Sequence, residues 1–201
     1  MATQNALFPG LENKTHRLGP DGFSYRENFI SEAEEAELVA ALTTLELKPF
    51  EFHGHLGNRR VASFGLRYDY PRRSLGTAEP FPSFLAELRE KIAKFAGRQV
   101  HEFQQGGVNE YPPGAGIGWH KDKSQFGLIV GVSLLGPATL RFRRTEGNRW
   151  VRMSQRLEPR SIYILEGEAR TLWEHSVPPV DALRYSLTFR TLLGSVPLVA
   201  S

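Results

Sequence analysis

The sequence contains no cysteine among its 201 residues. This absence excludes disulfides, thiolate metal ligands and a cysteine nucleophile, so a metal site in this chain has to use His, Asp and Glu. No apolar run approaches the roughly 18 residues that cross a bilayer. The N-terminal segment MATQNALFPG also lacks the basic-then-apolar layout of a secretory signal. We therefore expect no membrane association and a cytoplasmic location, or a nuclear one in a eukaryote.

The net charge of +3 is small, but the basic residues are clustered. Residues 141–160 contain seven arginines and two glutamates. A second cluster consists of Arg59, Arg60, Arg67, Arg72 and Arg73. Such clusters attract phosphate backbones, although a solvated basic surface is the alternative for each cluster taken alone. The distribution of charge thus points to a nucleic-acid partner without requiring one.

Two helices are predicted in the first half of the chain. Ser31 and Glu34 form a capping-box pattern, followed by helix-forming residues to about residue 43. A second helix is predicted over 82–96, where apolar residues fall on one face and Gly97 is a natural stop. The length suits one domain with its own core, or a core domain with a small lid.

After Gly97 the pattern changes to short β segments separated by turn signals. We expect strands near 99–105, 107–111, 117–121, 126–135, 138–144, 149–157, 161–165, 170–176 and 183–192. The segment TEGN, residues 145–148, is a plausible hairpin tip. Two helices followed by many short strands predict an α+β, mainly β fold with a sandwich or barrel as its core.

The sequence GWHKD places His120 and Asp122 two residues apart. On a strand, residues i and i+2 point to the same side, so an imidazole nitrogen and a carboxylate oxygen converge on one point. An isolated H-x-D also occurs by chance, and a third ligand is needed. His175, at the end of a predicted strand, is the obvious one. Two histidines and one carboxylate leave metal positions open for a cosubstrate and O2, which is typical of non-haem Fe(II) oxygenases.

The segment RYSLTFR, residues 184–190, is predicted to be a strand with two unlike faces. Alternation places four polar side chains on one face and three apolar ones on the other. If the polar face looks into a barrel, Arg184 and Arg190 require anions, because an unpaired buried charge is very costly. The gap between the two arms suits a small dicarboxylate, which arginine recognises bidentately. The alternative is a surface strand with both arginines in solvent.

Together these motifs resemble the AlkB family of Fe(II)/2-oxoglutarate dioxygenases. The matching pieces are Asn109-Glu110-Tyr111, PPGAGIGWHKD, His175 and RYSLTFR, in the family's order and spacing. They span about residues 100–192, and the resemblance starts more loosely near residue 23. It implies a jelly-roll (double-stranded β-helix) barrel with two flanking N-terminal helices and a substrate lid. It also implies Fe(II), 2-oxoglutarate and O2 as cofactors, and oxidative dealkylation with release of formaldehyde, succinate and CO2.

On this basis we divide the chain into an extended arm (1–22), helices plus a nucleotide-recognition-like lid (23–97) and a jelly-roll catalytic core (98–201), with 23–201 as one integrated domain. Carried over by position, the residues that resemble the iron ligands are His120, Asp122 and His175. Those that resemble cosubstrate contacts are Asn109, Tyr111, Arg184, Ser186 and Arg190, with Arg184 as the clamp on the distal carboxylate.

The chain departs from the family pattern at two positions. Ser186 stands where the family strand often has Asn, and its hydroxyl still offers a hydrogen bond. Ser124 stands where some nucleic-acid dealkylases carry an acidic residue that contacts the base. The preferred base is therefore left open by the sequence.

A base that is to be dealkylated has to be flipped out or unpaired, and it needs an aromatic or apolar platform. Phe64 and Tyr68 are candidates, with Arg72 beside them as a phosphate contact, since interleaved aromatics and arginines suit single-stranded nucleic acid. The alternative is a strand that packs both aromatics on the barrel. Trp173 shares a strand face with His175 and is a candidate pocket wall, as Ser124 is for a base contact; Trp119 is expected in the core.

The expected partner is alkylated single-stranded or flipped-base DNA or RNA, with a monomer as the default oligomeric state. Two other functions stay open at this stage. One is an oxygenase of the same type that hydroxylates a protein side chain, a lipid or a small molecule, which the absence of an acid at Ser124 favours. The other is a non-enzymatic jelly-roll binding module in which His120 and Asp122 are incidental.

Overall fold

The structure is a computed structural model that describes residues 19–52, 55–69 and 74–194. Its strands are β1 (Phe23–Arg26), β2 (Lys48–Phe52), β3 (His55–Phe64), β4 (Leu66–Asp69), β5 (Ser74–Thr77), β6 (Phe103–Tyr111), β7 (Ile117–His120), β8 (Phe126–Leu135), β9 (Ala138–Glu146), β10 (Arg149–Leu157), β11 (Ile162–Leu165), β12 (Glu174–Val177) and β13 (Arg184–Leu192). Its α-helices are α1 (Glu32–Leu42), α2 (Ala86–Ala96) and α3 (Gly167–Thr171). None of the helices in these ranges is long and apolar enough to cross a membrane.

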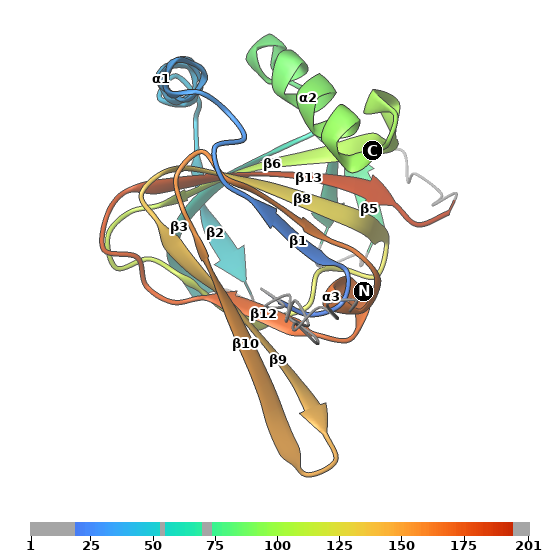
Figure 1. Cartoon of the computed structure of the whole chain (residues 1–201). Coiled ribbons are helices and arrows are strands. Elements are labelled where there is room, and N and C mark those ends of the chain that lie inside the picture. Colours follow the sequence, from blue (N-terminus) through green and yellow to red (C-terminus); the bar gives the residue numbers. More distant parts are fainter. Residues whose placement is uncertain (1–18, 53–54, 70–73, 195–201) are drawn as a thin grey trace, which may run out of the picture.

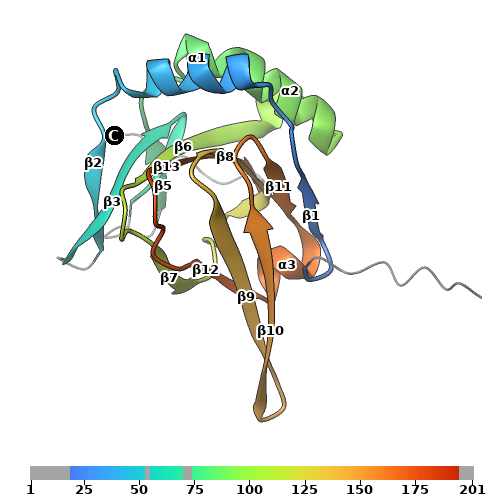
Figure 2. The ribbon, with the colours of Figure 1, turned by 60° about the vertical axis from the view of Figure 1, so that its left-hand side comes forward.

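Two antiparallel sheets form the barrel (Figure 1). The larger has seven strands in the order β1-β11-β8-β13-β6-β3-β2, and the smaller has four in the order β10-β9-β12-β7. Helices α1 and α2 lie across the outer face of the larger sheet, and the β9–β10 hairpin projects beyond the rest of the barrel (Figure 2). This arrangement confirms the predicted jelly-roll with two flanking N-terminal helices.

Both predicted helices are confirmed, with their caps. The Ser31 backbone N–H donates to the Glu34 carboxylate (2.7 Å), and the Glu34 backbone N–H donates to the Ser31 hydroxyl (3.2 Å). These bonds satisfy two N–H groups that the first turn of α1 would leave free. Helix α2 follows a single 3-10 turn and ends at Gly97, whose φ of 63° is the left-handed conformation that glycine adopts without strain.

The strand predictions needed two corrections. The segments predicted at 99–105 and 107–111 form one strand, β6, after a 3-10 turn at 100–102. The strand predicted over 170–176 begins only at Glu174, because 167–171 is the short helix α3 that buries Ala169 and Arg170. The predicted hairpin tip is confirmed by the turn between β9 and β10. Of the predicted N-terminal arm, residues 1–18 lie outside the described residues, and 19–22 form turns that lead into β1.

Strand β13 lies at the centre of the larger sheet and separates two environments. Its apolar side chains join the core beneath the helices; they are Tyr185, Leu187 and Phe189. Its polar side chains therefore point into the barrel, toward a second core that the two sheets share. The polar face of β13 was predicted to point inward because its apolar face has to be buried, and the structure confirms this orientation. The polar side chains of β13 therefore line the site.

Candidate metal and cosubstrate site

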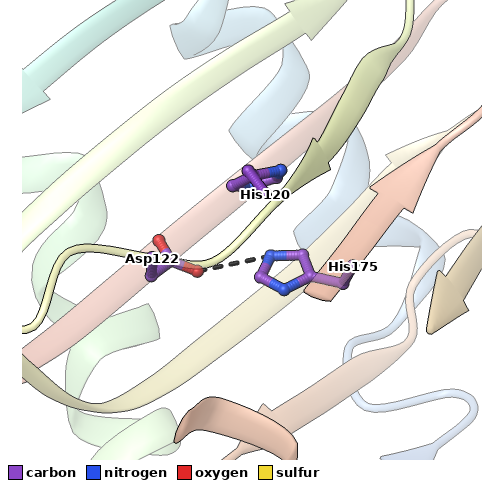
Figure 3. A group of neighbouring side chains, drawn as sticks. All are labelled: His120, Asp122 and His175. Carbon is purple, nitrogen blue, oxygen red and sulfur yellow. Dashed lines mark ion pairs between the residues drawn. The ribbon is translucent and has the colours of Figure 1, made fainter. Parts of the chain in front are cut away.

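The two histidines of the predicted metal site face each other across neighbouring strands. His120, the last residue of β7, is in register with His175 on β12, and their ring centroids are 4.3 Å apart. Asp122 lies in the loop just after β7, and its Oδ2 is 3.3 Å from His175 Nε2 (Figure 3). One ligand atom from each residue falls within 4.8 Å of the others. The geometry fits one metal ion bound by two imidazoles and one carboxylate.

The His120 ring is oriented by its own backbone. His120 Nδ1 lies 2.9 Å from the Gly118 carbonyl oxygen, which can only accept, so Nδ1 carries the proton and Nε2 keeps its lone pair. Burial and, to a lesser degree, the neighbouring His175 lower the pKa of His120 to about 4, while Asp122 opposes the change. The imidazole is therefore neutral at physiological pH, which is the form that binds metal.

A guanidinium holds the carboxylate ligand in its charged form. Burial alone would raise the pKa of Asp122, but Arg190 and the two histidines hold it well below its usual range. Arg190 Nε and Nη2 each lie 3.2 Å from Asp122 Oδ1, and its Nη1 donates to Gln105 Oε1 (2.6 Å). Arg190 thereby orients one oxygen of Asp122 and leaves Oδ2 on the side of His175.

The loop that follows Asp122 is held from α3. Arg170 is 6% exposed, and its Nη2 donates to the carbonyl oxygens of Lys123 and of Phe126, the latter at 2.8 Å. A planar guanidinium with several donors suits a clamp on two carbonyls. Arg170 could not be selected from the sequence, because its partners are backbone atoms more than forty residues away.

Arg184, the other arginine that was predicted to face the interior, is buried inside the barrel. Arg184 is 1% exposed, and its Nη2 donates to Ser133 Oγ (2.8 Å). Its Nε and Nη1 are buried and have no hydrogen-bond partner among the described residues. Its Cζ lies 5.1 Å from the centre of the Tyr111 ring. Because buried donors without partners are costly, these free donors indicate that Arg184 receives an acceptor from a ligand, as a carboxylate would supply.

Other inward-facing side chains line the same space. On β6, Tyr111 is in register with Arg184 and Asn109 with Ser186, so four of the predicted cosubstrate contacts lie side by side. Tyr163 on β11 enters from the other side, because Gly131 opposite it has no side chain; a Cβ there would lie 2.2 Å from the Tyr163 ring. Burial raises the pKa of Tyr163 to about 12, so it remains a neutral phenol. Sequence reasoning missed Tyr163 and Ser133; strand alternation was the available signal.

The predicted substrate contacts are less well placed. Phe64 is 6% exposed in the core beneath the helices, on the face of β3 that points away from the metal residues, so it cannot stack on a base there. Tyr68 is half-buried, with Lys123 Nζ 4.9 Å from its ring centre, and Ser124 is exposed. Arg72 lies outside the described residues.

The two tryptophan predictions have different outcomes. Trp173 is buried in the core between the sheets, and the surface cavity that it lines with Arg144 contains none of the metal residues. Trp119 is half-buried instead of in the core, because its ring carries Arg141 and Arg143 at 5.0 and 4.5 Å. The prediction of Trp119 in the core is therefore wrong, while the role of Trp173 as a pocket wall stays a prediction.

The profile of the 2OG-Fe(II) oxygenase superfamily matches residues 22–190 of this chain. The Arabidopsis thaliana alkylated DNA repair protein ALKBH8 homolog is 32% identical over 185 residues, which cover 80% of this chain and 52% of the relative. The Mus musculus tRNA (carboxymethyluridine(34)-5-O)-methyltransferase ALKBH8 is 32% identical over 180 residues, which cover 85% of this chain and 26% of the relative. This chain thus spans about half and about a quarter of the length of these two relatives.

Two further relatives match along most of their own length. The Danio rerio probable RNA/DNA demethylase ALKBH6 is 30% identical over 182 residues, which cover 83% of this chain and 74% of the relative. The structure of OsALKBH1 superposes with a TM-score of 0.62 at 18% identity, covering 85% of this chain and 96% of that one. At that identity the structural likeness establishes the fold.

Proposed function

Because the chain belongs to the 2OG-Fe(II) oxygenase superfamily and, within it, to the AlkB family, we propose that it removes N-alkyl groups from bases of DNA or RNA. The chain is a dioxygenase that uses Fe(II), 2-oxoglutarate and O2. The observation that carries the proposal is the convergence of His120, Asp122 and His175 beside a buried arginine with two free donors.

Different side chains would hold the iron and the 2-oxoglutarate. His120, Asp122 and His175 would hold the iron, while Arg184 would receive the distal carboxylate of 2-oxoglutarate and Tyr111 would lie beside it. Bound there, iron and 2-oxoglutarate supply oxidative hydroxylation of a C–H bond with O2, and 2-oxoglutarate leaves as succinate and CO2. On an N-methyl group the hydroxylated carbon departs as formaldehyde and leaves the unmodified base.

A nucleic-acid substrate is supported by the outer face of the smaller sheet. On the projecting hairpin, Arg152 is in register with Arg143, and Arg143 Nε donates to the Glu174 carboxylate (2.6 Å). The Arg143 guanidinium lies between two indoles, 4.5 Å from Trp119 and 4.4 Å from Trp150, and Trp150 is 46% exposed. Arginines that alternate with exposed aromatic rings suit a phosphate backbone with unpaired bases.

The test is a mass-spectrometric assay with Fe(II), ascorbate and 2-oxoglutarate. The substrates are matched single-stranded DNA and RNA oligonucleotides that carry 1-methyladenine, 3-methylcytosine or 3-methyluracil. We expect loss of a methyl group that depends on 2-oxoglutarate. Conversion of 2-oxoglutarate to succinate with every oligonucleotide unchanged would refute the nucleic-acid substrate and favour a protein, a lipid or a small molecule.

A further inference from the structure

Arg59 lies on the inner wall of the barrel, next to the site. It directly precedes Arg60, which is in register with Glu110 on the outer face of the larger sheet, so alternation turns Arg59 inward, opposite Tyr111. It is 8% exposed, and its Cζ lies 4.3 Å from the Phe50 ring centre and 5.9 Å from that of Tyr111.

No anion in the described part of the chain compensates this charge. Arg60, its neighbour, forms a bidentate ion pair with the buried Glu110 at 2.6 and 2.8 Å. Arg59 has neither an ion pair nor a hydrogen bond to a described residue. Its guanidinium instead lies over two aromatic rings. Rings offset part of the cost of burying a cation, but they are not conventional acceptors for its five N–H donors.

Asp122, the carboxylate of the metal site, is not available to pair with a positively charged base. Asp122 is engaged by Arg190 and faces His175. Ser124, two residues further on, is exposed and uncharged. A cationic base such as 1-methyladenine or 3-methylcytosine would therefore bring its charge beside the Arg59 guanidinium, while Asp122, the carboxylate of the metal triad, is already paired with Arg190.

We propose that Arg59 determines substrate specificity: it disfavours cationic alkylated bases and selects neutral ones that present carbonyl oxygens, such as an N3-alkylated uracil or thymine. Either carbonyl oxygen of a uracil ring can accept a hydrogen bond from the guanidinium, and the ring offers a flat face on which the guanidinium can stack. This inference rests on the proposed nucleic-acid function and names the substrate class of the same site.

The test compares three variants with the wild type. Arg59→Gln removes the charge, Arg59→Lys keeps it, and Arg67→Gln removes an exposed arginine of the same sequence cluster as a matched control. The substrates are single-stranded oligonucleotides of one sequence that carry 3-methyluracil, 1-methyladenine or 3-methylcytosine. The readouts are kcat/KM on each, the affinity of the anaerobic Fe(II)–2-oxoglutarate enzyme by fluorescence anisotropy, and the KM for 2-oxoglutarate.

We expect the wild type to prefer 3-methyluracil, and Arg59→Gln to lower its preference over the cationic bases by about tenfold, in both turnover and affinity. Arg59→Lys and Arg67→Gln should keep the preference, and the KM for 2-oxoglutarate should not change. An equal preference in wild type and Arg59→Gln would overturn the inference alone, as would a raised KM for 2-oxoglutarate with the preference intact. Absence of turnover on every oligonucleotide would instead refute the proposed function, and this inference with it.

Discussion

Replacing Arg184 by methionine should abolish tight binding of 2-oxoglutarate and leave the free protein at least as stable. The guanidinium is 1% exposed, and two of its nitrogens have no partner among the described residues. Removing one member of a buried, hydrogen-bonded charge pair costs about 2–5 kcal/mol of binding free energy. That cost corresponds to a loss in affinity of about 30- to 3000-fold.

The free protein should respond in the opposite direction. Replacing buried charge by well-packed apolar side chains of similar size can stabilise a fold by about 1–4 kcal/mol. The substitution also removes the bond to Ser133 Oγ, a loss of about 1 kcal/mol. Unfolding in urea without ligand should therefore show an equal or higher free energy of unfolding.

Anaerobic calorimetry of the Fe(II) enzyme with 2-oxoglutarate measures the affinity. The exposed Arg98 offers a matched control, since Arg98→Met removes one positive charge away from the site. A 2-oxoglutarate affinity for Arg184→Met within threefold of wild type would refute the assignment of Arg184 as the carboxylate clamp. A free protein destabilised by several kcal/mol would show that the buried guanidinium has a structural role.

Three other changes test the remaining parts of the site and fold. Asp122→Asn should lower Fe(II) affinity about a hundredfold or more and abolish turnover, because it removes the anionic ligand; retained turnover, measured as succinate release, would contradict the iron assignment. Arg170→Ala should weaken Fe(II) binding about tenfold by freeing the loop after Asp122, with the loss seen in metal titrations as well as in kcat. The pKa of Glu34 is lowered to about 2, chiefly by its bond to Lys91, so its contribution to stability is present above pH 4.5 and is lost as the pH falls toward 2. Glu34→Gln should therefore cost about 1 kcal/mol in urea unfolding at pH 7 and nothing near pH 2; an equal cost at both would refute the charged cap.

The metal residues were predictable because their geometry is nearly local. His120 ends β7 and Asp122 follows it by two residues in the loop, so the short spacing keeps both side chains at the same end of the strand. The inward orientation of Arg184 followed from one further condition, that the apolar face of β13 be buried. For these residues, the local sequence pattern was enough to predict the orientation of the side chains.

The residues that were missed or misplaced depend on the pairing between strands. On β3, Arg59 and Phe64 lie on opposite faces, and both faces are buried, so hydrophobicity does not reveal which one looks at the site. Phe64 was taken as the base platform for its aromatic ring, yet its face packs beneath the helices. Tyr163 reaches the site only because Gly131, on another strand, leaves room for its ring. The sequence of a single strand does not reveal such relations between strands.

The charged side chains on the inner wall of the barrel explain why the cofactors and the substrate should together determine the net charge of the site. Before anything binds, three guanidinium groups face the interior, those of Arg59, Arg184 and Arg190, against the single carboxylate of Asp122. Fe(II) and the dianion of 2-oxoglutarate enter with charges that cancel, so the excess of positive charge persists in the loaded site. Arg184 and Arg190 are then engaged, and the excess is concentrated at Arg59. Since no described residue forms an ion pair or hydrogen bond with Arg59, a substrate that lies beside it should be selected by its charge.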